Sequence, residues 1–214
     1  GDLLKQPVAQ KIEKRLKEWL ENHIGFVLKP LFKIRNAPLI GAVRGISFQL
    51  VQGLGVLPKN AAGRQLKVLA KEDYSALRRL GVKIGRQDIY MPALLKPKAA
   101  GLAALLWAVF QELGEVPSPP PPGRVSLPMD AALPLDFCRV AGFRQTGPLF
   151  LRVDILERLL GLIRRRASEG PFAVDAELLN LAGCTSVEME GVFIALGCNV
   201  DVRNGETLYN KSLR

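Results

Sequence analysis

The first part of the chain has the pattern of an amphipathic helix. Between Val8 and Leu28, one set of apolar residues recurs at steps of three and four, which is the spacing of a single helix face. These residues are Val8, Ile12, Leu16, Trp19, Leu20, Ile24 and Val27, with Lys11, Lys14, Arg15 and Glu18 on the other side. Pro30 is expected to limit this helix, because proline supplies no backbone N–H and clashes with the preceding turn.

Further helices are expected in the rest of the first half. Asn36 is a good N-cap for a helix with Pro38 in its first turn, and Gly53 or Gly55 suits its end. Shorter helices fit residues 60–69 and 71–80. Residues 82–91 look extended around Gly85, and an Ala- and Leu-rich helix is expected from Pro97 to about Leu113.

A proline-rich stretch then interrupts the pattern. Pro119 to Pro122 are four consecutive prolines, which cannot form a helix and favour a stiff polyproline II spacer. A proline-binding partner is an alternative use of the same stretch. We place the domain boundary here, between a domain over residues 1–112 and a domain over residues 125–214, with a linker over residues 113–124.

The second half has the element order of a winged helix. Short strands are expected at Gly142–Phe143 and Leu149–Val153, followed by a helix that Asp154 would cap. Two further helices, over 174–182 and 186–196, flank a short turn. The Asn204–Gly205 pair between two alternating segments is a strong hairpin signal. We therefore predict a mainly α fold, with a basic helical domain followed by a small α+β winged-helix-like domain.

Positive charge is concentrated at one end of the sequence. The net charge of +10 arises from residues 1–110, where 19 Lys and Arg face 7 Asp and Glu, while residues 111–150 and 151–214 each balance at −1. A local positive field attracts polyanions, and nucleic acid is the commonest of these. A surface tuned only for solubility is the alternative.

The sequence carries little chemistry of its own. It has no Walker phosphate loop, and the one histidine, His23, has no nucleophile partner nearby in sequence. The cysteines, Cys138, Cys184 and Cys198, lack metal-binding spacing and read as buried small side chains. We expect no catalytic residue, metal site or cofactor in this chain. The three scattered cysteines and the missing secretion signal or membrane span favour the cytoplasm and no membrane partner.

A basic cluster around residues 78–98 is the candidate binding site. Lys96 and Lys98 flank the start of a helix, where the positive end of the helix already favours anions. The predicted nucleic-acid-binding residues are Arg78, Arg79, Lys83, Arg86, Lys96 and Lys98. The alternative is that the two lysines simply face solvent.

Two groups in the second half are ambiguous. Arg164, Arg165 and Arg166 either contact RNA or balance the negative end of their own helix. Glu188 and Glu190 lie in the first turn of a helix that would approach phosphates in a DNA-reading winged helix, so this module is expected to pack against protein instead.

Three segments resemble one family. LRRLGVKIGRQDIYMPALLKPKAAGLAALLWAV (77–109), PLFKIRNAPLIGAVRGISFQLVQGLGVLP (30–58) and FRQTGPLFLRVDILERL (143–159) are similar to the region after the motor in superfamily 2 ATP-dependent RNA helicases. The likeness is to the mitochondrial degradosome type and, more closely, to its alphaproteobacterial homologues. It implies a parent protein whose RecA-like motor uses ATP and Mg²⁺, with helical domains beyond it that close a ring around the translocating strand.

These observations lead to one expected function and one rival. We expect an accessory C-terminal region of an RNA helicase that binds or guides single-stranded RNA by backbone electrostatics, without ATPase activity of its own. Its partners would be single-stranded RNA or another nucleic acid and the motor domains of the parent chain. The alternative is a protein–protein docking module for RNA-degradation or ribosomal factors.

Overall fold

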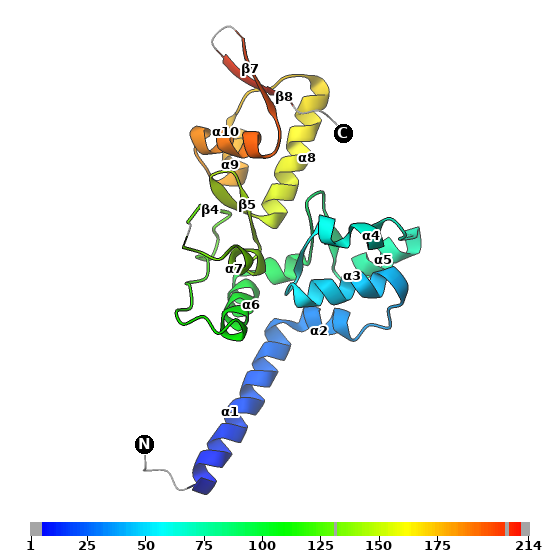
Figure 1. Cartoon of the computed structure of the whole chain (residues 1–214), viewed down its shortest axis with the longest axis vertical. Coiled ribbons are helices and arrows are strands. Elements are labelled where there is room, and N and C mark those ends of the chain that lie inside the picture. Colours follow the sequence, from blue (N-terminus) through cyan, green and yellow to red (C-terminus); the bar gives the residue numbers. More distant parts are fainter. Residues whose placement is uncertain (1–5, 131, 204–205, 211–214) are drawn as a thin grey trace.

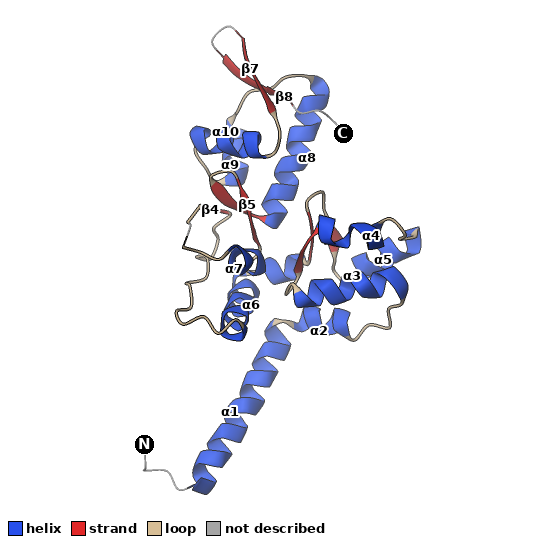
Figure 2. Ribbon diagram, in the orientation of Figure 1, coloured by secondary structure: helices blue, strands red, loops and turns tan. Residues whose placement is uncertain are grey.

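The chain folds as a mixed α+β protein that is 58% helical. A computed structural model describes residues 6–130, 132–203 and 206–210. Within these residues lie ten α-helices, two 3₁₀ turns and three small antiparallel sheets. Figures 1 and 2 show a long N-terminal arm, a middle region of helices around small sheets, and an upper lobe that ends in a hairpin. The predicted helical character is confirmed at this coarse level, although strands occur in both halves.

The amphipathic N-terminal helix is confirmed, but most of it extends away from the body. Helix α1 spans Gln6–Val27, and only its last turn packs on the first-half core, where Ile24 and Val27 are partly buried. Its apolar face is otherwise exposed, with Trp19 at 60% of its possible surface. Figure 1 shows α1 projecting from the middle region.

The next two helices differ from the sequence prediction. Helix α2 (Lys29–Arg35) contains Pro30 in its first turn, where a missing N–H costs nothing, so this proline begins a helix. Asn36 is the C-cap of α2, and α3 (Gly41–Gln52) starts at Gly41, so the predicted cap at Asn36 is wrong. Gly41, the first residue of α3, has a left-handed backbone (φ 57°) that turns the chain into this helix.

A small three-stranded sheet follows. Strands β1 (Val56–Pro58), β2 (Lys83–Ile84) and β3 (Asp88–Tyr90) pair in the order β1-β3-β2, and the β2–β3 hairpin turns around the predicted Gly85. The intervening chain forms a 3₁₀ turn (Lys59–Ala62), α4 (Gly63–Leu66) and α5 (Lys71–Arg79). Ile46, Leu50, Leu77 and Ile89 are fully buried in the core that joins these elements.

Helix α6 and the proline-rich stretch lie against each other. A 3₁₀ turn (Pro92–Leu95) leads into α6 (Pro97–Phe110), and the chain then returns along this helix. Pro120 and Pro121 line a hollow together with Ala100 and Gly101 of α6. The prolines therefore cover α6 and do not form a free spacer.

Side chains from both sides of that stretch share one hydrophobic cluster. Ala104 and Ala108 of α6 are buried with Phe137 of α7 (Leu135–Val140), Phe143 of β5 and Phe150 of β6. Strands β4 (Ser126–Pro128), β5 (Phe143–Thr146) and β6 (Leu149–Arg152) form a second sheet in the order β4-β6-β5. This shared cluster argues against two halves that fold independently, and the predicted boundary itself stays a prediction.

The C-terminal elements occur in the predicted order. They are α8 (Val153–Glu169), α9 (Ala176–Ala182), α10 (Ser186–Ala195) and the antiparallel strands β7 (Asn199–Arg203) and β8 (Glu206–Asn210). The N-cap of α8 is Arg152, so the expected Asp154 cap is wrong; Asp154 lies in the first turn and accepts hydrogen bonds from Arg152. The predicted Asn204–Gly205 turn lies outside the described residues.

Candidate nucleic-acid interface

The positive charge of the first half is left almost unpaired. Within described residues 6–130, Lys14 is the one Lys or Arg that forms an ion pair, with Glu18 on the exposed face of α1. In the second half, by contrast, carboxylates pair with Arg139, Arg144, Arg152, Arg165 and Arg166. The two halves therefore differ in how much of their positive charge is neutralised, as well as in how much they carry.

One acid of the first half is withdrawn from its surface. Asp88 of β3 is buried, and its Oδ1 atom lies 2.6 Å from Nη1 of Arg144 on β5. This carboxylate consequently pairs with an arginine of the second half and with no cation of the first half among the described ion pairs.

All six predicted binding residues are exposed, but they are distributed over three places. Arg78 and Arg79 end α5, Lys83 and Arg86 lie on the β2–β3 hairpin, and Lys96 and Lys98 lie at the start of α6. In Figure 1, α5 and α6 lie on different sides of the small sheet between them. The six are therefore spread over one basic region and do not form a single compact cluster.

The start of α6 retains the features that suggested an anion site. Its N-cap is Lys96, without a side-chain cap, and no acidic residue lies in its first turn. Lys98 is exposed on that turn. No acidic residue of this turn therefore offsets the partial positive charge of the helix end.

The tip of the β2–β3 hairpin is held by a carboxylate from the other half. Glu157 of α8 accepts hydrogen bonds from three consecutive backbone N–H groups, of Arg86 (2.5 Å), Gln87 (2.7 Å) and Asp88 (3.1 Å). Consecutive N–H groups in a turn make a concave site for an anion. A Cβ built on Gly85 would overlap this carboxylate, so the absence of a side chain there permits the close approach.

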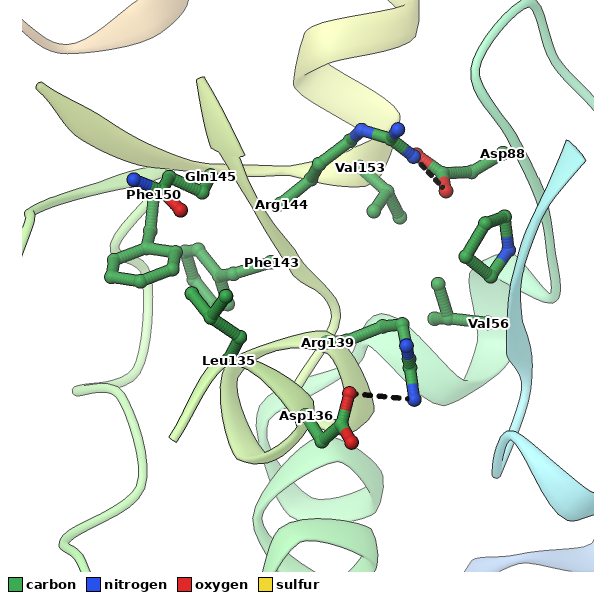
Figure 3. A pocket seen from close by; sticks show the side chains of 11 residues that line it. Val56, Asp88, Leu135, Asp136, Arg139, Phe143, Arg144, Gln145, Phe150 and Val153 are labelled. Atoms are coloured by element: carbon green, nitrogen blue, oxygen red, sulfur yellow. Dashed lines mark hydrogen bonds and ion pairs between the residues drawn. The ribbon is translucent and has the colours of Figure 1, made fainter. Parts of the chain in front are cut away.

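The Arg144–Asp88 pair supports the same hairpin from β5. Figure 3 shows the two side chains facing each other beside a cavity of about 290 Å³ that Val56 and Val153 also line. Burial raises the pKa of Asp88 above its usual value, although the Arg144 guanidinium opposes this shift, because desolvation of the carboxylate outweighs the pairing. Among the described atoms, Asp88 Oδ2 has no hydrogen-bond partner.

These contacts position a cationic cavity. A hollow of about 440 Å³ is lined by Lys59, Asn60, Arg86, Gln87 and Arg144, together with Gly63 and Leu66. The lining contains no carboxylate and three cations, of which Arg144 is already paired with Asp88. It is chemically suited to an oxyanion such as a phosphate, because Arg and Lys donors and an amide converge on it.

Sequence reasoning found only one member of this cavity. Arg86 was among the predicted residues, whereas Lys59 and Arg144 are 27 and 58 positions away in the sequence and meet Arg86 through the fold. Glu157 was also missed, because a lone glutamate inside an amphipathic helix carries no signal of the turn it binds.

Two of the three consecutive arginines of α8 form ion pairs within the protein. Arg166 lies 2.7 Å from Asp175 and 2.6 Å from Glu177, at the N-terminal end of α9, and Arg165 lies 3.9 Å from Glu177. These arginines therefore balance acids of the next helix, which is a third role beside the two that the sequence suggested. Arg164 is exposed.

The described residues hold no cluster of three or more His, Cys, Asp or Glu that could bind a metal ion. His23 stacks on Trp19 on the surface of α1, with ring centroids 5.1 Å apart. Cys138 and Cys198 are buried, and burial raises the pKa of the Cys138 and Cys184 thiols to about 11. Such thiols are almost entirely protonated at neutral pH and are poor nucleophiles.

In the described parts of the chain, no single helix is both long enough and apolar enough to cross a membrane. Helices α9 and α10 are long and apolar enough only when they are counted as one segment, and the chain bends by 81° at the break between them.

Comparison with protein-family models, with curated proteins and with solved structures finds no match to this chain.

Proposed function

We propose that this chain binds or guides single-stranded RNA through contacts between its basic first half and the RNA backbone, without ATPase activity of its own. The observation that carries the proposal is the unneutralised charge of that half. Of its Lys and Arg side chains within residues 6–110, Lys14 is the one in an ion pair, and the buried Asp88 is turned toward Arg144. Such a field attracts a polyanion and binds it with weak sequence preference.

The cationic cavity offers a defined place where one phosphate of the RNA would bind. Lys59, Arg86 and Arg144 line one hollow, and the backbone beneath it is held by Glu157. A phosphate bound there would meet donors that are already positioned, so little ordering would be needed on binding. Exposed Lys96 and Lys98 provide a second place for the strand at the start of α6.

The proposed setting is a larger helicase. The resemblance of residues 30–58, 77–109 and 143–159 to the post-motor region of degradosome-type RNA helicases supports a place after a RecA-like motor. ATP and Mg²⁺ would belong to that motor, which would be the partner of this chain in the cytoplasm. The elements α8 to β8 would form a winged-helix-like module that packs on protein, since the Glu188 carboxylate in the first turn of α10 would repel phosphates.

A salt series with a single-stranded RNA tests the proposal. Fluorescence anisotropy should show tight binding at low salt that weakens steeply as salt rises. Each phosphate contact adds about 0.7 to the slope of log K against log salt, so replacing Lys83, Arg86, Lys96 and Lys98 with Gln should lower the slope by up to about 3. Replacing Arg164, Arg165 and Arg166 should do less, because two of them already pair with acids.

Two results would contradict the proposal. One is a wild-type chain that does not bind at low salt. The other is an equal loss of affinity in both variant sets, which would remove the assignment to the first half.

A docking function has one observation in its favour. The apolar face of α1 is exposed along most of its length, including Leu16 and Trp19, and such a face is normally covered by another protein element. If the chain fails to bind RNA, this arm makes docking of a degradation or ribosomal factor the remaining function.

A further inference from the structure

A second cavity lies in the first half, away from the predicted cations. It has a volume of about 430 Å³ and lies between the end of α2, residues 37–39 and one face of α3. Arg44, Ser47, Phe48 and Val51 line it from α3, at the three- and four-residue steps of a single helix face. Its size is within the range of small-molecule sites, about 300 to 1,000 Å³.

A buried hydroxyl at this cavity has no partner. Ser47 is 4% exposed, and among the described atoms its Oγ forms no hydrogen bond, although a serine inside a helix can bond to the carbonyl four residues earlier. Leaving such a group unsatisfied costs about 1–3 kcal/mol. A ligand group that reached this hydroxyl from the cavity and accepted or donated a hydrogen bond would remove this cost.

The charged residues at the cavity are both cations. Arg35 ends α2, with its guanidinium 4.8 Å from the centroid of the Phe32 ring, and Arg44 lies in the first turn of α3. Neither forms an ion pair in the described part of the chain, and no Asp or Glu lines the cavity or lies in the first turn of α3. The cavity is therefore complementary to a ligand that carries negative charge at its edge.

An aromatic side chain completes the lining. Phe48 is 61% exposed although it borders an apolar wall made by Leu39 and Val51. An exposed ring beside cations is the arrangement on which the bases of a single strand stack.

We propose that this cavity binds one nucleobase of a single-stranded RNA. The base would stack on Phe48 and form a hydrogen bond with Ser47 Oγ, and the flanking phosphates would contact Arg35 and Arg44. The inference rests on the proposed RNA binding and adds to it a base-dependent site beside the charge-dependent surface.

The first experiment compares single-stranded RNA oligonucleotides with and without an abasic position. The wild-type chain should bind the intact strand more tightly, and Phe48→Ala should abolish this difference. Loss of one stacked base costs about 1–3 kcal/mol, or roughly 5- to 150-fold in affinity. Phe110→Ala is the matched control, because Phe110 is an exposed phenylalanine on α6, away from the cavity.

Ser47→Ala separates a binding role from a structural one. It removes an unsatisfied hydroxyl, so the melting temperature should stay the same or rise, while affinity for the intact strand falls. The slope of log K against log salt should not change for Ser47→Ala or Phe48→Ala, and should fall by about 0.7 for Arg44→Gln if it contacts one phosphate.

The outcomes separate this inference from the proposed function. If the wild-type chain binds RNA with the expected salt slope while Ser47→Ala and Phe48→Ala bind as tightly as wild type, the cavity is not a base site and the RNA-binding proposal stands. A titration with AMP tests the cavity without the strand: saturable binding that is lost in Phe48→Ala supports a nucleobase site, and failure of RNA binding beside it would overturn the assignment of a single strand as the source of the base. Equal displacement of AMP by inorganic phosphate would identify a phosphate site and overturn the assignment of a base.

Discussion

Arg144 on β5 donates a 2.6 Å hydrogen bond to Asp88 on β3, across 56 residues of sequence and across the proline-rich stretch. The same arginine lies 3.4 Å from the carbonyl oxygen of Gln87, which also accepts a bond from the N–H of Lys59. Together with Glu157, this pair fixes the β2–β3 hairpin to the second half. Charge-assisted bonds of this kind are about twice as strong as neutral ones. The two halves are therefore joined by polar contacts at the hairpin as well as by the shared hydrophobic cluster.

Replacing Glu157 should weaken that junction. Glu157→Gln should lower the free energy of unfolding by roughly 1–3 kcal/mol, because an amide nitrogen cannot accept bonds from the N–H groups of the turn. Gly85→Ala should cost a similar amount, since a Cβ at position 85 displaces the carboxylate.

A double-mutant cycle with Glu157→Ala provides the control. Once the carboxylate is gone, Gly85→Ala should cost far less, which gives a large coupling energy in chemical denaturation. Strict additivity of the two changes would show that the carboxylate does not occupy the turn.

Asp88 should give the stability an unusual dependence on pH. Its pKa in the folded chain is raised by burial, so the folded state holds this proton to higher pH than the unfolded state, whose pKa is near 3.8. The contribution of Asp88 to stability should therefore fall as pH rises from about 3.8 through the folded pKa.

The comparison variant is Asp88→Asn, which keeps an oxygen for Arg144 and does not titrate. The difference in unfolding free energy, wild type minus variant, should decrease with rising pH in this window, by about 1.4 kcal/mol per unit of raised pKa. An increase would mean that the ion pair with Arg144 outweighs desolvation.

The shared cluster predicts how the two halves depend on each other. Phe150→Ala should lower the free energy of unfolding by about 3–5 kcal/mol. It should also reduce the hydrogen-exchange protection of α6, because Phe150 packs in the same cluster as Ala104 and Ala108.

Cutting the chain within residues 117–123 tests the predicted boundary directly. We expect the two pieces to stay associated in size-exclusion chromatography. Two separate, stably folded pieces with dispersed proton spectra would confirm the predicted boundary as a division between domains.

The capping box at the start of α10 should lose its contribution to stability in acid, as is usual for a carboxylate. Backbone and hydroxyl donors of Thr185 lower the pKa of Glu188, and the Thr185 hydroxyl accepts from the N–H of Glu188 in return. This capping box should contribute stability above the unfolded pKa of about 4.5, and the contribution should be lost as pH falls through the lower folded pKa.

Thr185→Ala should cost about 1 kcal/mol at neutral pH. Thr185→Ala combined with Glu188→Gln should cost less than the sum of the two single changes, because each partner needs the other. Equal costs at pH 7 and at pH 3 would show that the carboxylate does not act through its charge.

Local patterns predicted the elements better than their arrangement. The helix that begins at Ser186, the extended segments around Gly85 and the helix that begins at Pro97 depend on neighbouring residues, and the structure confirms them. The limit that Pro30 was expected to set on the first helix is confirmed, because α1 ends at Val27. Asn36 misled because asparagine suits either end of a helix, and here it ends α2. The path of the proline-rich stretch was missed because composition reports its stiffness but not the surface that it covers.

The candidate site shows the same division. Exposed cations such as Lys83 and Lys98 are visible in the sequence because charge density is a local property. The cavity that joins Lys59, Arg86 and Arg144, and the one beside Ser47, require distant segments to meet. The exposure of the six predicted cations agrees with a binding role, and that role stays a prediction.

The long separation between the hairpin and its anchor has a consequence during synthesis. Arg86 leaves the ribosome 71 residues before Glu157. At about 5–20 residues per second, the hairpin therefore waits roughly 4 to 14 s for the carboxylate that holds its turn. Over that interval the three N–H groups of the nascent basic half face solvent beside its cations, and a cellular polyanion can reach the turn before the protein's own anion arrives.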